Sequence, residues 1–234
     1  MARIVVALLS LAALGSAHPA LAQRRELTVL GGGNLSGATG PNLFRGQTRA
    51  GFVGGLSLRL PRTPRFSVQT ELLIARHQLF GQRAATTQPP LQAGLLADEA
   101  QLLSLEIPVL LRFQRGYSQL LPVRPFMVLG PYIGVRLNCR REVTESNGNK
   151  HITDCTVASG SFGSETVLPA VYQEVDVGLL AGLGVEIHRV ALGARFQRSF
   201  RNLVEPQGGI HTSPFDGSRL WVATVTAEFL IRVI

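Results

Sequence analysis

Cysteine and lysine are scarce in this chain, and both scarcities bear on the class of protein. Two cysteines, Cys139 and Cys155, cannot build a disulfide-rich scaffold or a four-cysteine zinc site. Lys150 is the only lysine, so the net charge of +8 comes almost entirely from arginine. The arginines are scattered and do not alternate with aromatic residues in one segment, which argues against nucleic acid as a partner.

Long apolar runs are also missing, except at the N-terminus. Residues 4–14 are almost wholly apolar, Arg3 precedes them, and Ala20-Leu21-Ala22 follows as a small-x-small cleavage site. This layout predicts a secretory signal peptide over residues 1–22, because the run is shorter than the roughly 20 residues of a membrane-spanning helix. We expect residues 23–234 to form the mature domain.

The mean hydropathy of +0.20 is high for an exported β-protein without a transmembrane helix. A membrane β-barrel explains a chain that is apolar but has no transmembrane helix, because pairing between its strands satisfies the hydrogen bonds of the backbone within the bilayer. Alternation of apolar and polar residues predicts eight strands. In the last of them Val225, Ala227 and Phe229 form one row, and Thr226 and Glu228 form the other. The expected strands cover about 26–34, 49–60, 66–77, 102–114, 124–137, 172–187, 190–201 and 219–234.

The connections between these strands alternate in length. They are long, short, long, short, long, short and long, at 35–48, 61–65, 78–101, 115–123, 138–171, 188–189 and 202–218. Barrels of the outer membrane have short periplasmic turns and long external loops. The sequence therefore predicts an all-β fold, an eight-stranded antiparallel up-and-down transmembrane β-barrel.

The apolar rows can face lipid or, as in a soluble lipocalin-type barrel, the interior. We favour lipid, because the strands are long enough to cross a bilayer and the polar rows are rich in glycine, with few charges. The expected lipid-facing residues include Val177, Leu179, Ala181, Leu183, Val225, Ala227 and Phe229. Aromatic residues near strand ends are expected to form interfacial girdles, namely Phe66, Phe113, Phe126, Tyr172, Phe200 and Trp221.

The charged residues of the polar rows are of both signs, which predicts a paired network across the lumen instead of an open pore. The expected members are Glu71, Glu106, Arg112, Arg136, Asp176, Glu186, Arg195, Glu228 and Arg232. Arg195 is expected near the middle of the lumen with Glu71 and Glu106, where its guanidinium can meet two carboxylates. Both cysteines lie in the expected loop 138–171, and two thiols in an exported chain favour a Cys139–Cys155 disulfide.

Three segments resemble the PorT-like outer-membrane β-barrel proteins. Leu105–Phe113, with the sequence LEIPVLLRF, resembles their fourth strand, and Arg124-Pro125-Phe126 leading to 130–134 looks like the fifth. The glycine-rich segment 176–184 looks like the sixth. The resemblance implies an eight-stranded outer-membrane barrel with no family-wide catalytic residue, and some relatives serve a secretion or gliding apparatus. The chain ends in Ile234, although such barrels commonly end in an aromatic residue.

Catalytic and metal-binding motifs are not evident. The histidines of the expected mature domain, His77, His151, His188 and His211, are far apart, and we interpret His77 and His188 as solvated strand ends. The segment 160–164 lacks the spacing of a nucleophile elbow. His211, Ser213 and Asp216 share one loop and offer residue types for acyl transfer, so a lipid-modifying enzyme stays open as an alternative.

We therefore expect a non-enzymatic protein of the bacterial outer membrane with a structural, adhesive or envelope-assembly role. A narrow channel for small or apolar solutes is the other alternative, although eight strands enclose a lumen that side chains nearly fill. No cofactor or metal is expected. The expected partners are outer-membrane lipids, the barrel-assembly machinery and an unidentified envelope protein.

Overall fold

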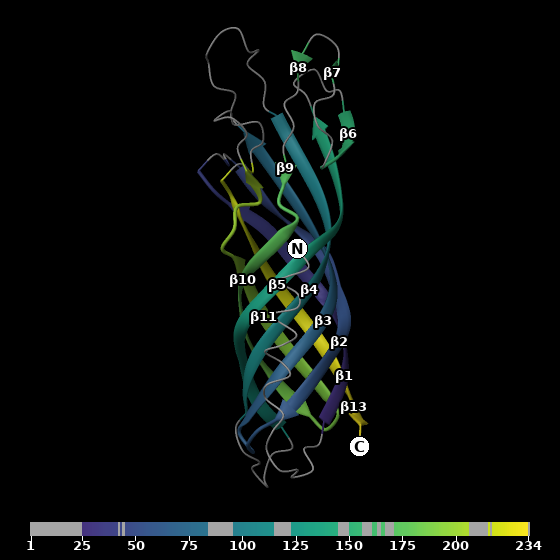
Figure 1. Cartoon of the computed structure of the whole chain (residues 1–234), viewed down its shortest axis with the longest axis vertical. Helices are drawn as coiled ribbons and strands as arrows, with labels where there is room; N and C mark the ends of the chain where they lie inside the picture. Colours follow the sequence, from purple (N-terminus) through teal and green to yellow (C-terminus); the bar gives the residue numbers. More distant parts are fainter. Residues whose placement is uncertain are drawn as a thin grey trace, which may run out of the picture.

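The chain folds into one closed barrel in its computed structural model (Figure 1). The structure describes residues 25–41, 43, 45–83, 96–114, 123–144, 150–155, 161–162, 165–166, 171–205, 215 and 217–233. The expected signal peptide lies outside these residues. No helix in the described ranges is long and apolar enough to cross a membrane.

Eight antiparallel strands make the barrel wall, in the order β10-β11-β13-β1-β2-β3-β4-β5, and β5 pairs with β10 to close it. The eight are β1 (Arg25–Thr39), β2 (Arg45–Pro61), β3 (Phe66–Arg83), β4 (Leu96–Gln114), β5 (Val123–Thr144), β10 (Val175–Ile187), β11 (Val190–Ser199) and β13 (Arg219–Val233). The five short strands are β6 (Lys150–Asp154), β7 (Ser161–Phe162), β8 (Glu165–Thr166), β9 (Val171–Tyr172) and β12 (Val204–Glu205). The expected number of barrel strands and their up-and-down order are thus confirmed.

The two ends of the barrel differ. At one end Arg25 of β1 pairs with Val233 of β13, and residues 188–189 join β10 to β11 in a tight turn where His188 has a φ of 55°. We call this the turn end. At the other end, the loop end, β6 pairs with the last residues of β5, and β9 pairs with β12 (Figure 1).

The strands extend further towards the loop end than the sequence pattern predicts. The expected long connection 35–48 is wrong, because β1 continues to Thr39 and β2 begins at Arg45. Likewise β5 continues to Thr144, so Cys139 belongs to a strand and not to a loop. The apolar alternation stops earlier because these upper segments lie above the apolar band, where backbone pairing continues without an apolar outer row.

The outward row of the wall is apolar over most of its height. All seven residues expected to face lipid point outward, and Leu183 and Val225 are the most exposed, at 68% and 66%. Large apolar side chains this exposed would be costly in water, and they form a continuous band around the barrel. The band is the surface that a bilayer covers.

The aromatic residues divide between the two faces. Phe66 and Phe113 lie outward near the turn end with ring centroids 5.0 Å apart, and Trp221 lies outward near the loop end. The expectation that Phe126 and Tyr172 belong to the girdles is wrong, because both are buried inside. Phe126 follows the inward parity of β5. Tyr172 belongs to the short strand β9, which is not one of the eight wall strands, and its side chain is buried.

Candidate functional site

The lumen near the turn end is filled by a network of arginine and glutamate side chains. Arg195 of β11 donates from Nη1 to Glu71 Oε2 at 2.6 Å and from Nη2 to Glu228 Oε1 at 2.5 Å. These three residues come from strands β11, β3 and β13, and all are buried. One guanidinium therefore links three strands of the wall across the lumen.

A second pair of arginines continues the network towards the turn end. Arg59 of β2 and Arg112 of β4 each donate to Glu186 Oε2 at 2.9 Å. Arg59 also lies 3.1 Å from Glu26, and the second oxygen of Glu228 lies 3.6 Å from both guanidinium groups. We call the set the turn-end network: Glu26, Arg59, Glu71, Arg112, Glu186, Arg195 and Glu228.

Aromatic packing supports the network from one side. The Arg112 guanidinium lies over the Phe126 ring, 3.4 Å from its centroid, as in a cation–π contact. A Cβ at Gly184 would come within 2.5 Å of this ring, so the glycine gives the ring its space. Arg124 lies on the rim, more exposed, 3.8 Å from Glu186.

Two further acids lie higher in the lumen. Glu106 of β4 accepts from Ser104 at 3.1 Å and from Gln197 at 3.4 Å, and lies 2.8 Å from His77 Nε2. Asp176 of β10 accepts hydrogen bonds from Tyr132, at 2.7 Å, and from Ser199. Neither carboxylate meets an arginine among the described residues, so these acids are held by neutral groups and by one histidine.

The interpretation of His77 as a solvated strand end is wrong. β3 continues to Arg83, which places His77 inside the wall with 2% of its surface exposed. Glu71 and His77 share the inward parity of β3, so extending the expected strand beyond residue 77 would have placed His77 inside the lumen. His188, in contrast, is exposed in the turn between β10 and β11.

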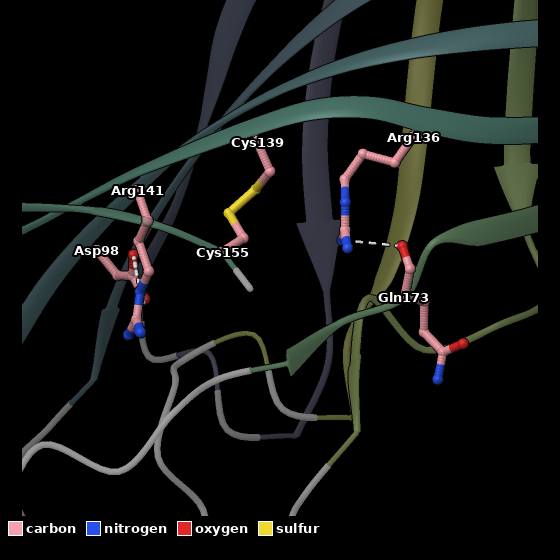
Figure 2. Close-up of a disulfide and its surroundings, with 6 residues drawn as sticks. All are labelled: Asp98, Arg136, Cys139, Arg141, Cys155 and Gln173. Carbon is pink, nitrogen blue, oxygen red and sulfur yellow. Dashed lines mark hydrogen bonds and ion pairs between the residues drawn. A yellow bond between two sulfur atoms is a disulfide. The ribbon is translucent and has the colours of Figure 1, made fainter. Parts of the chain in front are cut away.

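The loop end of the lumen is closed by apolar side chains, which we call the loop-end cap. Its buried members are Leu79, Ala100, Leu102, Cys139, Cys155, Tyr172, Val204, Phe215, Leu220 and Val222. Cys139 and Cys155 form a disulfide with a Cα–Cα distance of 5.5 Å, within the usual range (Figure 2). The bridge joins β5 to the residue that follows β6.

Two arginines lie beside this disulfide (Figure 2). Arg141 forms a buried ion pair with Asp98, with Nη2 and Oδ2 2.7 Å apart. Arg136, expected among the paired charges, instead donates to the Gln173 carbonyl at 2.9 Å. It stands at the loop end, away from the turn-end network.

The expected network and the observed contacts overlap in part. Glu71, Arg112, Glu186, Arg195 and Glu228 come together, whereas Glu106 and Asp176 make separate contacts. Arg232 belongs to β13, but its side chain lies outside the described residues. The sequence pattern missed Arg59, Glu26 and the Asp98–Arg141 pair. Ser57 and Arg59 alternate with apolar residues in β2, and that signal could have identified Arg59.

Two small cavities lie in the described lumen. A cavity of about 50 Å³ lies between His77, Glu106 and the loop-end cap, and another of about 20 Å³ lies between Arg195 and Leu180. A space of this size holds a few water molecules. The two cavities share His77 and Glu106 as lining residues, the first reaches Tyr172 and Leu220 of the loop-end cap, and the second reaches Arg195 of the turn-end network.

A metal-binding cluster is not found in the described part of the chain. No group of three or more His, Cys, Asp or Glu side chains there could hold a metal ion. His211, Ser213 and Asp216, the residues that kept an acyl-transfer site open, lie outside the described residues.

The chain was compared with known protein families and with solved structures. A family model described as outer membrane protein beta-barrel domain matches residues 18–205. Among solved structures, Neisserial surface protein A is 13% identical, with a TM-score of 0.43 over 87% of this chain and 96% of that chain. OprG from Pseudomonas aeruginosa is 9% identical, with a TM-score of 0.45 over 90% and 97%. Ail of Yersinia pestis is 13% identical, with a TM-score of 0.40 over 89% and 99%. No curated protein matches the chain.

Proposed function

Because the chain belongs to the outer membrane protein beta-barrel domain family and lies in the bacterial outer membrane, we propose that it is a non-enzymatic, non-conducting barrel that acts through its loop end. Its role is structural, adhesive or in the assembly of the envelope. The observation that carries the proposal is the filled lumen.

A conducting barrel needs a continuous polar path through its lumen. Two layers of side chains, the turn-end network and the loop-end cap, lie across that path. The turn-end network joins carboxylates and guanidinium groups from seven of the eight wall strands, namely β1, β2, β3, β4, β10, β11 and β13. Opening that layer would separate buried ion pairs, which is strongly unfavourable. The loop-end cap then closes the other side with apolar groups.

The loop end is a polar surface that side-chain contacts and the disulfide hold in place. Strands β3, β4 and β5 continue past the apolar band, where their outward side chains become polar, as in Arg76, Gln101 and Arg140. The Arg76 guanidinium donates to Gln101 at 2.7 Å, and the disulfide ties β5 to the end of β6. A rigid polar wall that projects from the membrane suits the binding of a partner, because little order is lost on binding.

The finer assignments follow from the sequence. We place the chain with the PorT-like barrels, on the resemblance of its fourth, fifth and sixth strands. Residues 1–22 are proposed to direct export, the barrel-assembly machinery to insert the mature chain, and an envelope protein to meet the loop end. With short turns and both strand termini at the turn end, that end faces the periplasm and the loop end faces outward.

The test is complementation of a deletion strain. We expect the wild-type chain to restore adhesion or envelope integrity, and a Cys139→Ser/Cys155→Ser variant present at the same level to restore less. A Leu56→Val variant, altered only on the lipid-facing row of β2, is the matched control and should behave as the wild type. Restoration of solute uptake instead would favour a channel, and release of lipid products by the purified protein would favour an enzyme.

A further inference from the structure

A groove on the lipid-facing wall leads to a pair of exposed arginines. The groove, of about 680 Å³, runs from Phe66 at the turn end of β3 across β4, β5 and β10 to β11. Ala181, Gly182 and Ala194 are the small residues that line it, and Phe113, Met127 and Phe196 are among the bulky ones.

Strand register places Arg198 directly above this groove. Leu183 pairs with Ala194, Ala181 pairs with Phe196, and the next outward pair towards the loop end is Leu179 with Arg198. Arg198 is exposed and lies between the exposed rings of Phe196 and Phe200 on the same strand face. Arg198 is the last outward residue of β11, which ends at Ser199 towards the loop end.

A second arginine and the single tryptophan of the chain complete the surface. Arg198 pairs with Trp221 across β11 and β13, so Arg219 is its diagonal neighbour, at a Cα distance of about 7–8 Å. Both arginines are exposed, and neither forms an ion pair within the described part of the chain. The Trp221 ring stacks on the Phe196 ring, with the two centroids 6.4 Å apart. The ring also lies against Gly37, where an added Cβ would come within 2.7 Å of it, so the ring packs between these two residues.

We propose that this surface binds a phosphorylated, multiply acylated lipid of the outer leaflet, that is, lipid A. The two guanidinium groups take a phosphate, and an acyl chain lies in the groove over Ala181 and Ala194. Guanidinium groups bind phosphate through paired, charge-assisted hydrogen bonds. An unpaired arginine next to the hydrocarbon region is favourable only near the interface or beside an anion, and this site supplies the polar and the apolar half of one amphiphile in the right order.

The test uses the full-length mature chain, refolded in zwitterionic detergent, with Trp221 fluorescence as the signal. Phosphorylated lipid A, dephosphorylated lipid A, phosphatidylglycerol and inorganic phosphate are titrated separately. We expect a saturable change with phosphorylated lipid A that is at least tenfold weaker with each of the other three. An equal response to inorganic phosphate, to dephosphorylated lipid A or to phosphatidylglycerol would overturn the proposal.

Variants separate the two halves of the site. Arg198→Gln and Arg219→Gln should each lower the affinity for phosphorylated lipid A about tenfold, because each removes a charge-assisted contact. Ala194→Leu, which fills the groove, should weaken it to a similar degree. Arg189→Gln, in the exposed turn at the opposite end, is the matched control and should bind as the wild type.

Native mass spectrometry of the same variants counts bound lipid directly, without relying on Trp221. Retention of lipid A by the Arg198→Gln/Arg219→Gln double variant at the wild-type level would contradict the proposal. A groove covered by a second copy of the chain, seen as a dimer that excludes lipid, would also contradict it.

Discussion

Replacing Arg195 with leucine should destabilise the barrel strongly, because it leaves buried carboxylates without their counter-charge. Glu71 and Glu228 lie 2.6 Å and 2.5 Å from the guanidinium, and both are at most 2% exposed. Removing one partner of a buried ion pair costs roughly 3–5 kcal/mol. Glu71 retains the Gln69 amide at 2.6 Å, and Glu228 retains Arg59 and Arg112 at 3.6 Å, so we expect a loss near the lower end of that range.

The assay is denaturant titration of the refolded barrel in vesicles of zwitterionic lipid. Arg198→Leu is the matched control, because it removes the same side chain three residues along β11 but from the outward row, and it should cost little. Adding Glu71→Gln to Arg195→Leu should recover part of the loss, since a neutral amide needs no counter-charge. Equal stability of Arg195→Leu and Arg198→Leu would refute the reasoning, as would a double variant no more stable than Arg195→Leu.

Two further variants test the outer wall and the disulfide. Ala227→Arg should cost about 2–4 kcal/mol in the same titration, because it puts a charge on the lipid-facing row, whereas Ala227→Leu should be nearly neutral; equal effects would mean that this row does not face lipid. Cys139→Ser/Cys155→Ser removes a cross-link worth roughly 3 kcal/mol in the chain-entropy model, but that effect should stay local, because the barrel wall holds β5 independently. Limited proteolysis should therefore cut the loop end faster while the barrel keeps its heat-dependent gel mobility, and loss of that mobility difference would contradict local action.

The fold could be predicted from the sequence because the outward rows alternate strictly where lipid covers them. Leu179 and Leu183 of β10 and Val225 of β13 each lie two residues from the next apolar neighbour, and a slip by one residue would turn the row inward. Above the band the constraint disappears. Ser36 and Thr39 continue β1 by backbone pairing, helped at Ser36 by hydrogen bonds between its hydroxyl and the backbone of Gln78, and no apolar alternation marks this segment as strand.

The interior could be predicted only in part, because parity shows which side chains point inward but not which meet. Arg195 was expected near Glu71 and Glu106; it contacts Glu71 and Glu228, while Glu106 meets His77. The tilt of the strands displaces residues of equal position along different strands, so depth counted along each strand does not give their neighbours. Arg59 was missed because β2 alternates less regularly than the later strands.

The central claim, a lumen closed by the turn-end network and the loop-end cap, is tested most directly by electrical recording of the refolded wild-type chain in planar bilayers. The filled interior predicts insertion without steady conductance at any applied voltage within the stability of the bilayer. Steady, ohmic conductance of the wild type would contradict a closed lumen and favour a channel, if it appears with each insertion and persists in every lipid tested.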